Sequence, residues 1–129
     1  MNDRNEALTL EVLEGGFSVC KVADYSGVDL EAGFCFTGRT DAERSLVCET
    51  DRVPGNTLAR DDGWSGFRVR GTLDFALTGI LARLSAVLAD ARVGIFAVST
   101  YDTDYVFVKT RDLERALDAL AGAGYRLAR

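Results

Sequence analysis

Two stretches of the chain combine polar side chains with backbone groups that can hold a small charged molecule. The first is the run 71–80, Gly-Thr-Leu-Asp-Phe-Ala-Leu-Thr-Gly-Ile, which joins a strand-like pattern to a helical one. Where a helix begins, several backbone N–H groups lack a partner and carry a partial positive charge, so this junction can receive a carboxylate. Asp74 offers another interpretation, because an aspartate at a helix start can cap those groups itself.

The second stretch is the run 99–104, Ser-Thr-Tyr-Asp-Thr-Asp. Hydroxyl groups donate and accept hydrogen bonds, and carboxylates accept them from an ammonium group. Together these side chains can hold the two charged groups of an amino acid. The same residue types also build ordinary hairpin turns, through hydrogen bonds to nearby backbone, and the residues alone leave both interpretations open.

Other chemistries have less support in the sequence. The chain has no histidine, and its cysteines lie in three separate apolar runs, at Cys20, Cys35 and Cys48. This excludes a Cys/His zinc site and a Cys–His nucleophile, and favours buried, reduced thiols. Asp102 and Asp104 with Glu43 are a weak candidate for Mg²⁺ or Ca²⁺, because the glycine spacing of a calcium loop is missing. Neither phosphate-binding glycine motif occurs. We therefore expect no enzymatic activity, no metal and no cofactor.

The elements that would position these residues follow from hydrophobic periodicity. Apolar residues recur with helical spacing from Leu77 to Leu88 and from Leu113 to Leu120. Runs rich in Val, Ile, Phe and Tyr predict strands, at Phe67–Gly71, Ile95–Ser99, Tyr105–Val108 and Gly124–Leu127. The order strand, helix, strand, strand, helix, strand predicts a ferredoxin-like α+β unit, one four-stranded sheet with two helices on one face.

The N-terminal half reads as strands without helices. Predicted strands lie at Leu8–Leu13, Phe17–Val22, Phe34–Thr37 and Ser45–Glu49, with a short one at Thr57–Arg60. Glu14-Gly15-Gly16 predicts a hairpin turn between the first two, Ala23–Gly33 a loop, and Asp51–Gly63, which contains the only proline, a boundary. Gly16–Cys20 resembles Gly66–Arg70 at an offset of 50, and Ser45–Cys48 resembles Tyr105–Val108 at an offset of 60. This internal repeat predicts that the first half is a truncated copy of the second.

The residues Gly71–Phe75, Leu77–Ile80 and Ser99–Tyr105 resemble those of an ACT domain. The chain is similar to small bacterial tandem-ACT proteins related to the regulatory domain of aspartate kinases and to the cytosolic arginine sensors of animals. The resemblance implies a tandem of ferredoxin-like (βαββαβ) ACT units: a degenerate, strand-rich unit at 1–62 and an ACT domain at 63–129.

The resemblance also implies a ligand site. In related ACT domains the loop after the first strand receives the carboxylate and amine of an amino acid, and the matching positions here are Thr72, Leu73, Asp74, Phe75, Thr78 and Gly79. In the arginine-sensing relatives a similar run lies at a pocket between ACT units, which carries over to Ser99, Thr100, Thr103 and Asp104. Arg39, Thr40 and Asp41 occupy the equivalent place in the first copy and depart from the pattern.

We therefore expect a regulatory protein that binds a small amino acid between ACT units, acts as a homodimer and controls a partner enzyme. The alternative is a protein–protein interaction or oligomerisation module without a small ligand. The net charge of −5 argues against nucleic acid, and it is unevenly distributed, with 6 basic and 13 acidic residues in 1–62 against 9 and 7 in 63–129. Without a signal-like or membrane-spanning apolar run, we expect a cytoplasmic protein that does not bind membranes.

Overall fold

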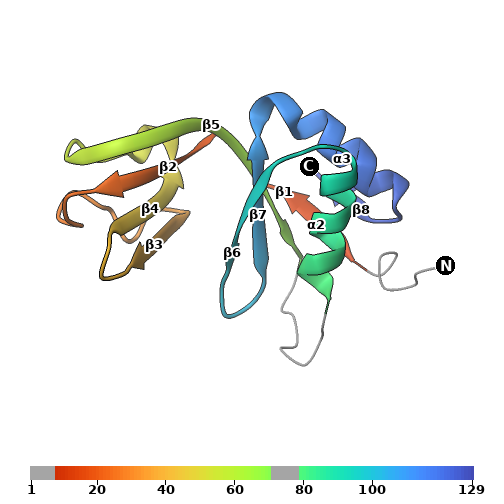
Figure 1. The fold of residues 1–129 in the computed structure, drawn as a ribbon, viewed down its shortest axis with the longest axis horizontal. Helices are drawn as coiled ribbons and strands as arrows, with labels where there is room; N and C mark the ends of the chain where they lie inside the picture. The colour runs from red at the N-terminus through yellow and green to blue at the C-terminus, as the bar shows by residue number, and fades with distance from the viewer. Residues whose placement is uncertain (1–7, 71–78) are drawn as a thin grey trace. The chain divides into compact units, whose positions relative to one another are not determined.

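The computed structural model describes residues 8–70 and 79–129. The chain divides within one long strand, β5 (Thr57–Val69), into two compact units. We call residues 15–64 the strand unit, and residues 1–14 with 65–129 the helical unit. Both are drawn in Figure 1.

The strand unit is a four-stranded antiparallel sheet. Its strands are β2 (Phe17–Val22), β3 (Cys35–Arg39), β4 (Arg44–Glu49) and the first part of β5, in the order β3-β4-β2-β5. A short 3-10 helix, η1 (Thr50–Arg52), follows β4. A small core of Cys20, Val22, Leu46 and Cys48 lies on one face. As predicted, residues 23–33 form turns rather than a helix.

The helical unit has the predicted ferredoxin-like order of strands and helices. From the end of β5 the chain continues through α2 (Ile80–Asp90), β6 (Ile95–Ser99), β7 (Asp104–Lys109), the 3-10 helix η2 (Thr110–Asp112), α3 (Leu113–Gly122) and β8 (Arg126–Ala128). α2 and α3 pack together (Figure 1), and both contribute to one core with the strands. The buried residues of this core include Ile80, Leu84 and Leu88 from α2, Ala116 and Leu120 from α3, and Leu10, Phe67, Val69, Val106 and Val108 from the sheet.

The sheet of the helical unit differs from the four-stranded prediction by one added strand. β1 (Thr9–Val12) pairs antiparallel with β5, through Leu10 opposite Val69, and parallel with β8, through Leu10 opposite Leu127. The order is therefore β6-β7-β5-β1-β8. The predicted hairpin between β1 and β2 is wrong, because the two strands instead pair with different parts of β5. This is also why residues before Gly15 group with the C-terminal unit and not with residues 15–64.

The region 51–63, which was predicted to be a boundary, contains the first seven residues of the continuous strand β5. β5 runs through residues 57–69, where a short strand, a break and a second strand were expected. A register shift in its pairing with β2 marks an irregularity, since Phe17 is opposite Trp64 but Val19 is opposite Asp61. Gly63, with φ of +83°, lies in this bulge, and glycine adopts such a φ without the steric cost of a side chain.

The repeat seen in the sequence recurs in the structure at the same offset of 60. β3 and β6, β4 and β7, and η1 and η2 have matching bounds under that shift. The two hairpin turns also match, because Thr40 N–H donates to Glu43 O and Thr100 N–H donates to Thr103 O, each at 2.9 Å. The strand unit lacks counterparts of α2 and α3, as expected of a truncated copy.

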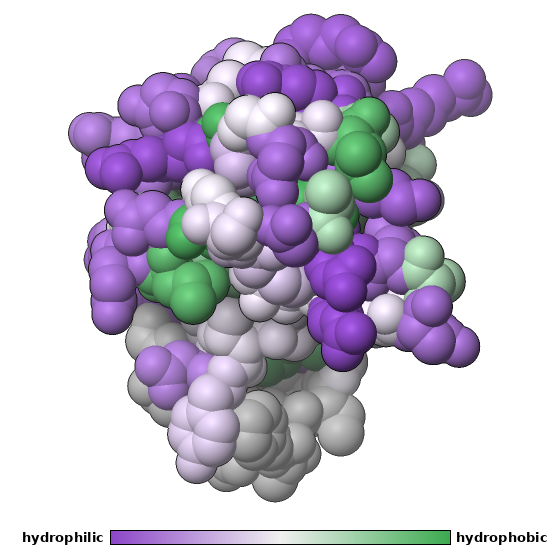
Figure 2. All heavy atoms as spheres, turned by 90° about the vertical axis from the view of Figure 1, so that its left-hand side faces the viewer, coloured by the Kyte–Doolittle hydropathy of each residue, from purple (hydrophilic) through white to green (hydrophobic). Residues whose placement is uncertain are grey.

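The face drawn in Figure 2 is mainly hydrophilic, with hydrophobic residues in small separate areas. Residues 15–64 hold nine acidic and five basic side chains, in line with that surface. Within the described ranges 8–70 and 79–129, no helix has the length and hydrophobicity needed to cross a membrane.

Candidate functional site

The turn between β6 and β7 is held by its own polar side chains. Ser99 Oγ donates to Asp104 Oδ1 at 2.6 Å, across the base of the turn. Thr100 closes the turn with its N–H and with its hydroxyl, which donates to Thr103 O at 3.1 Å. Tyr101 and Asp102 are exposed at the tip. The predicted residues Ser99, Thr100, Thr103 and Asp104 therefore do lie together, and a hairpin turn accounts for their mutual hydrogen bonds.

Thr103 connects this turn to the end of β5. Its side chain is 6% exposed, and its hydroxyl donates to the Val69 carbonyl at 2.7 Å. Val69 is the last residue of β5, and the predicted junction begins two residues later. The hydrogen bond thus holds the turn against the strand end from which the other predicted stretch continues.

Most of the predicted strand-to-helix junction, the run 71–80, lies outside the described residues. Thr72, Leu73, Asp74, Phe75 and Thr78 lie outside the described residues, and so does the predicted capping role of Asp74. Gly79 is described. It precedes α2 as its N-cap with φ of +78°, and it offers no side chain to the free N–H groups of the helix start. The positive potential of this helix start therefore is not offset by a capping side chain at position 79.

The turn offers suitable groups for a polar ligand. Asp104 is half-buried and accepts one hydrogen bond through Oδ1. Within the described part of the chain, no hydrogen bond to its second oxygen is found. A carboxylate with a free oxygen can accept a hydrogen bond from an ammonium group. Thr103, by contrast, uses its hydroxyl on Val69 and can contribute only by fixing the turn.

Two polar residues of the helical unit that contact each other, half-buried Arg83 and buried Tyr125, were missed in the sequence. Arg83 lies one turn into α2 and its N–H donates to Gly79 O at 2.9 Å. Tyr125, just before β8, is 4% exposed and belongs to the main core. The helical pattern contained the signal for Arg83, since position 83 follows buried Ile80 by three residues and therefore lies near the apolar stripe.

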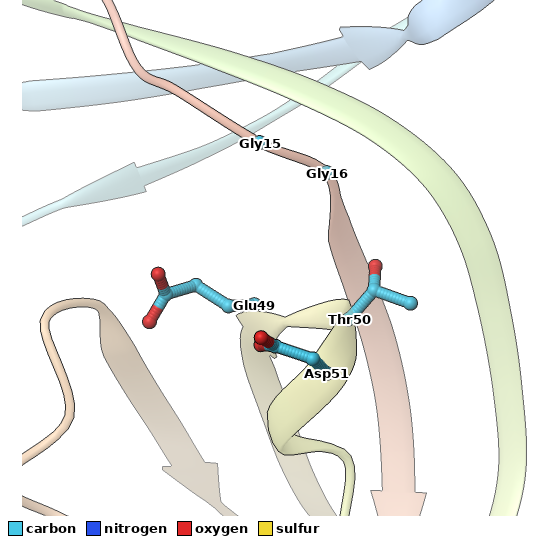
Figure 3. A pocket seen from close by; sticks show the side chains of 5 residues that line it. All are labelled: Gly15, Gly16, Glu49, Thr50 and Asp51. Carbon is cyan, nitrogen blue, oxygen red and sulfur yellow. The ribbon is translucent and has the colours of Figure 1, made fainter.

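A hollow of about 330 Å³ lies in the strand unit, between the Gly15-Gly16 turn and the end of β4. Glu49, Thr50 and Asp51 line its other side (Figure 3). The buried Ser18 hydroxyl makes two hydrogen bonds beside the hollow. It donates to Asp62 Oδ1 at 2.5 Å, and it therefore accepts from the Thr50 hydroxyl at 3.0 Å. The hollow is acidic, because Glu49 at the end of β4 and Asp51 of η1 both line it.

The other weak candidates remain unsupported. Arg39, Thr40 and Asp41 are exposed, and Thr40 Oγ1 accepts the N–H groups of Ala42 and Glu43 in an ordinary turn. Among the described residues, no cluster of three acidic or cysteine side chains, such as Glu43 with Asp102 and Asp104, has the geometry to hold a metal ion.

The cysteines are free thiols. Cys20 and Cys48 are buried next to each other in the core of the strand unit, whereas Cys35 is only half-buried. Burial, together with the neighbouring thiols, raises the pKa of Cys48 to about 12, and burial raises the pKa of Cys20 and Cys35 as well. All three are therefore protonated and weak nucleophiles at neutral pH.

Comparison with known proteins assigns the family. A family model described as the ACT domain matches residues 59–122, from β5 through α3. A crystal structure of a protein from Agrobacterium tumefaciens is 37% identical and superimposes with a TM-score of 0.82, covering 93% of this chain and 91% of that one. The chain belongs to the ACT domain family. No curated protein matches it.

Aspartate kinases share the fold of this ACT protein. The regulatory subunit of aspartate kinase from Thermus thermophilus, in its ligand-free form, superimposes with a TM-score of 0.60 at 11% identity, covering 88% of this chain and 95% of that one. Aspartate kinase from Clostridium acetobutylicum gives 0.63 at 16% identity, covering 91% of this chain but only 34% of the enzyme. The expected likeness to the regulatory domain of aspartate kinase is confirmed at the level of the fold.

Proposed function

We propose that this ACT protein is a non-catalytic regulator that binds a small amino acid where ACT units meet. The observation that carries the proposal is the hydrogen bond from Thr103 to Val69. It brings the β6–β7 turn to the end of β5, the strand that precedes the other chosen stretch in the sequence. The likeness to a regulatory subunit of aspartate kinase supports the regulatory role.

In this proposal the turn and the helix start have complementary tasks. Asp104 accepts from the ammonium group of the amino acid, while Ser99 and Thr100 present polar groups beside it. The residues Thr72, Leu73, Asp74, Phe75, Thr78 and Gly79 form the other wall, where backbone N–H groups at a helix start favour a carboxylate. Thr103 fixes the position of the turn.

Regulation would follow from differential binding. A ligand shifts an equilibrium between two arrangements only as far as its affinities for them differ. An amino acid held between units, or between the subunits of a homodimer, stabilises the arrangement that completes its site. A partner enzyme that binds only one arrangement would then respond to the concentration of the amino acid.

We also propose that residues 1–62 are a degenerate ACT unit in tandem with the ACT domain of residues 63–129. The support is the shared offset of 60 between β3-β4-η1 and β6-β7-η2, including the threonine that begins each turn.

Isothermal titration calorimetry with two matched variants tests the site. Asp104→Asn keeps an oxygen that can accept from Ser99 but removes the charge, so it should weaken amino-acid binding by at least about tenfold, the loss of one charged hydrogen bond. Asp102→Asn removes an exposed charge from the same turn and should bind as the wild type does. Equal affinities of the two variants would refute the assignment of Asp104.

One observation favours the alternative of an oligomerisation module. Among the residues that the structure describes, β6 pairs only with β7 and so is an edge of the sheet, and its half-buried residues are apolar, at Ile95, Phe96 and Val98. An exposed apolar edge strand is a template for pairing with a second chain. A dimer by light scattering that is unaffected by amino acids, and lost in Val98→Lys, would favour this alternative.

A further inference from the structure

The three cysteines of the chain converge on one face of the strand unit. Cys20 lies on β2, Cys35 on β3 and Cys48 on β4, and each belongs to the core of this unit or packs against it. The thiols of Cys20 and Cys48 are hydrogen-bonded to each other. Cys35 is partly exposed to solvent, whereas the other two are buried. Thiols gathered in this way can form a disulfide if the backbone brings one pair close enough.

Cys35 and Cys48 are directly opposite each other in the β3–β4 ladder. The turn of this hairpin determines which kind of pair they form. Thr40 N–H donates to Glu43 O at 2.9 Å, and hydrogen-bonded and non-hydrogen-bonded pairs alternate along an antiparallel ladder. Cys35 and Cys48 lie five positions further from the turn, so they are a non-hydrogen-bonded pair, with Cα atoms about 4.5 Å apart. Disulfides span Cα distances of about 4.4–6.8 Å, and this pair can therefore be bridged without moving the backbone.

The contact between Cys20 and Cys48 is less suitable for a disulfide. Cys20 is opposite Leu46, and Cys48 is opposite Ser18, so the two cysteines are diagonal neighbours on adjacent strands. Diagonal Cα atoms lie about 7–8 Å apart, which is beyond the range that a disulfide spans without backbone movement. The geometry therefore selects Cys35 as the partner of Cys48, and Cys20 provides a comparison within the same core.

The exposure of the two sulfurs decides the order in which they react. Cys35 is half-buried and is the one that meets a reagent from solution, whereas buried Cys48 reacts afterwards within the chain. Burial, and to a smaller extent the charge of Asp29, raises the pKa of Cys35, and the pKa of Cys48 is raised to about 12. Because the thiolate is the reactive form, both steps are slow at neutral pH. The pair therefore stays reduced unless an oxidant persists.

We propose that Cys35 and Cys48 form a disulfide that locks β3 to β4 when the surrounding thiol pool becomes oxidised. The oxidant is a small disulfide, RS–SR. The Cys35 thiolate attacks it, which breaks the RS–SR bond, forms a mixed disulfide and releases RS⁻, and this thiolate takes up the proton that Cys35 lost. Cys48 then attacks the Cys35 sulfur, and the second RS⁻ leaves with the proton of Cys48 as RSH. Two protein thiols are thus oxidised to one disulfide while RS–SR is reduced to two RSH.

The disulfide would stabilise the strand unit. It closes the loop of residues 35–48, which lowers the conformational entropy of the unfolded chain. Among the described residues β3 pairs only with β4, so the bond adds a covalent link to a strand that is held on one side. We expect oxidation to raise Tm by about 5–10 °C. β3 and β4 belong to the strand unit and Asp104 to the helical unit, so this proposal and the proposed function can fail separately.

Tryptic peptide mapping identifies the bond, because the three cysteines fall in different peptides, Asn5–Lys21, Val22–Arg39 and Ser45–Arg52. The native chain is reduced, incubated for a day with millimolar oxidised glutathione, alkylated and digested without reductant. We expect Val22–Arg39 joined to Ser45–Arg52, lighter by two hydrogen atoms than the sum of the two peptides. Asn5–Lys21 joined to Ser45–Arg52 would overturn the proposal, and so would glutathione retained on Cys35. The absence of a joined peptide, although the urea-unfolded chain forms disulfides in the same buffer, would overturn it as well.

Two variants connect the bond to stability. In Cys20→Ala the joined peptide and the rise in Tm should persist, whereas Cys35→Ala should lose both. Circular dichroism and the Tm of each reduced variant verify folding, and dithiothreitol should return the oxidised wild type to its reduced Tm. An equal rise in Tm in Cys35→Ala, or a joined wild type whose Tm is unchanged, would show that the bond does not lock the strand unit.

Discussion

The link between the β6–β7 turn and β5 can be removed by one nearly isosteric substitution. Thr103→Val replaces the hydroxyl that donates to Val69 O at 2.7 Å by a methyl group and leaves the shape of the side chain unchanged. The site is 6% exposed, so water does not readily replace the lost donor. The cost is a neutral hydrogen bond plus part of the desolvation of a carbonyl, about 1–3 kcal/mol.

That cost predicts a measurable change in unfolding. With an unfolding entropy of about 2.1 cal/mol/K per residue, 1 kcal/mol corresponds to about 4 °C for a chain of this length, so Tm should fall by about 4–11 °C. In urea the midpoint should fall while the m-value stays the same. The control is Thr37→Val on the exposed edge strand β3, which should change stability by less than about 0.5 kcal/mol. If the two variants are equally stable, the turn is not held to β5 as described.

Two further predictions concern the cores. A Cβ atom at position 66 would lie 2.8 Å from Cε1 of buried Phe107, so Gly66→Ala should destabilise the fold by about 1–3 kcal/mol. Gly94→Ala meets nothing within 4 Å and should be neutral or stabilising by up to about 1 kcal/mol; the reverse ranking in urea unfolding would contradict the packing. The raised pKa of Cys48, about 12 against 9.0, means that the folded state holds its proton more tightly than the unfolded state does. Its contribution to stability is complete below pH 9 and is lost as the pH rises from about 9 towards 12. The stability of the wild type relative to Cys48→Val should therefore fall over that range, and a constant difference would show that Cys48 is not buried as described.

Local patterns were enough to predict most elements. The apolar stripe of α2 and the apolar runs of β2, β4, β6 and β7 were found within a few residues of their observed bounds, because helical spacing marks one buried face and β-branched and aromatic residues suit strands. Gly124, with φ of +101°, follows α3, and glycine is favoured where a helix ends in the left-handed conformation. The hairpin turn at Ser99–Asp104 was likewise readable from its short polar side chains.

The remaining features depend on contacts between residues far apart in the sequence. β1 and β2 flank two glycines and look like a hairpin, yet β1 pairs with β5 and β8, more than 50 residues away. Register between distant strands is set by which buried faces fit, and a single sequence does not record this. In the same way, the contact of Arg83 with Tyr125 joins two residues that are 42 positions apart in the sequence. Only the position of Arg83 near an apolar stripe could have drawn attention to it.

Thermal unfolding of the purified chain in the presence of each amino acid at millimolar concentration shows whether the protein binds an amino acid. A ligand at 100 times its dissociation constant stabilises the native state by about 2.7 kcal/mol, which is a rise in Tm of about 10 °C for this chain. We predict that one amino acid, or a few related ones, raises Tm well above the rest, and that Asp104→Asn reduces the rise to about half or less. A panel in which no amino acid changes Tm would contradict it and favour the oligomerisation module.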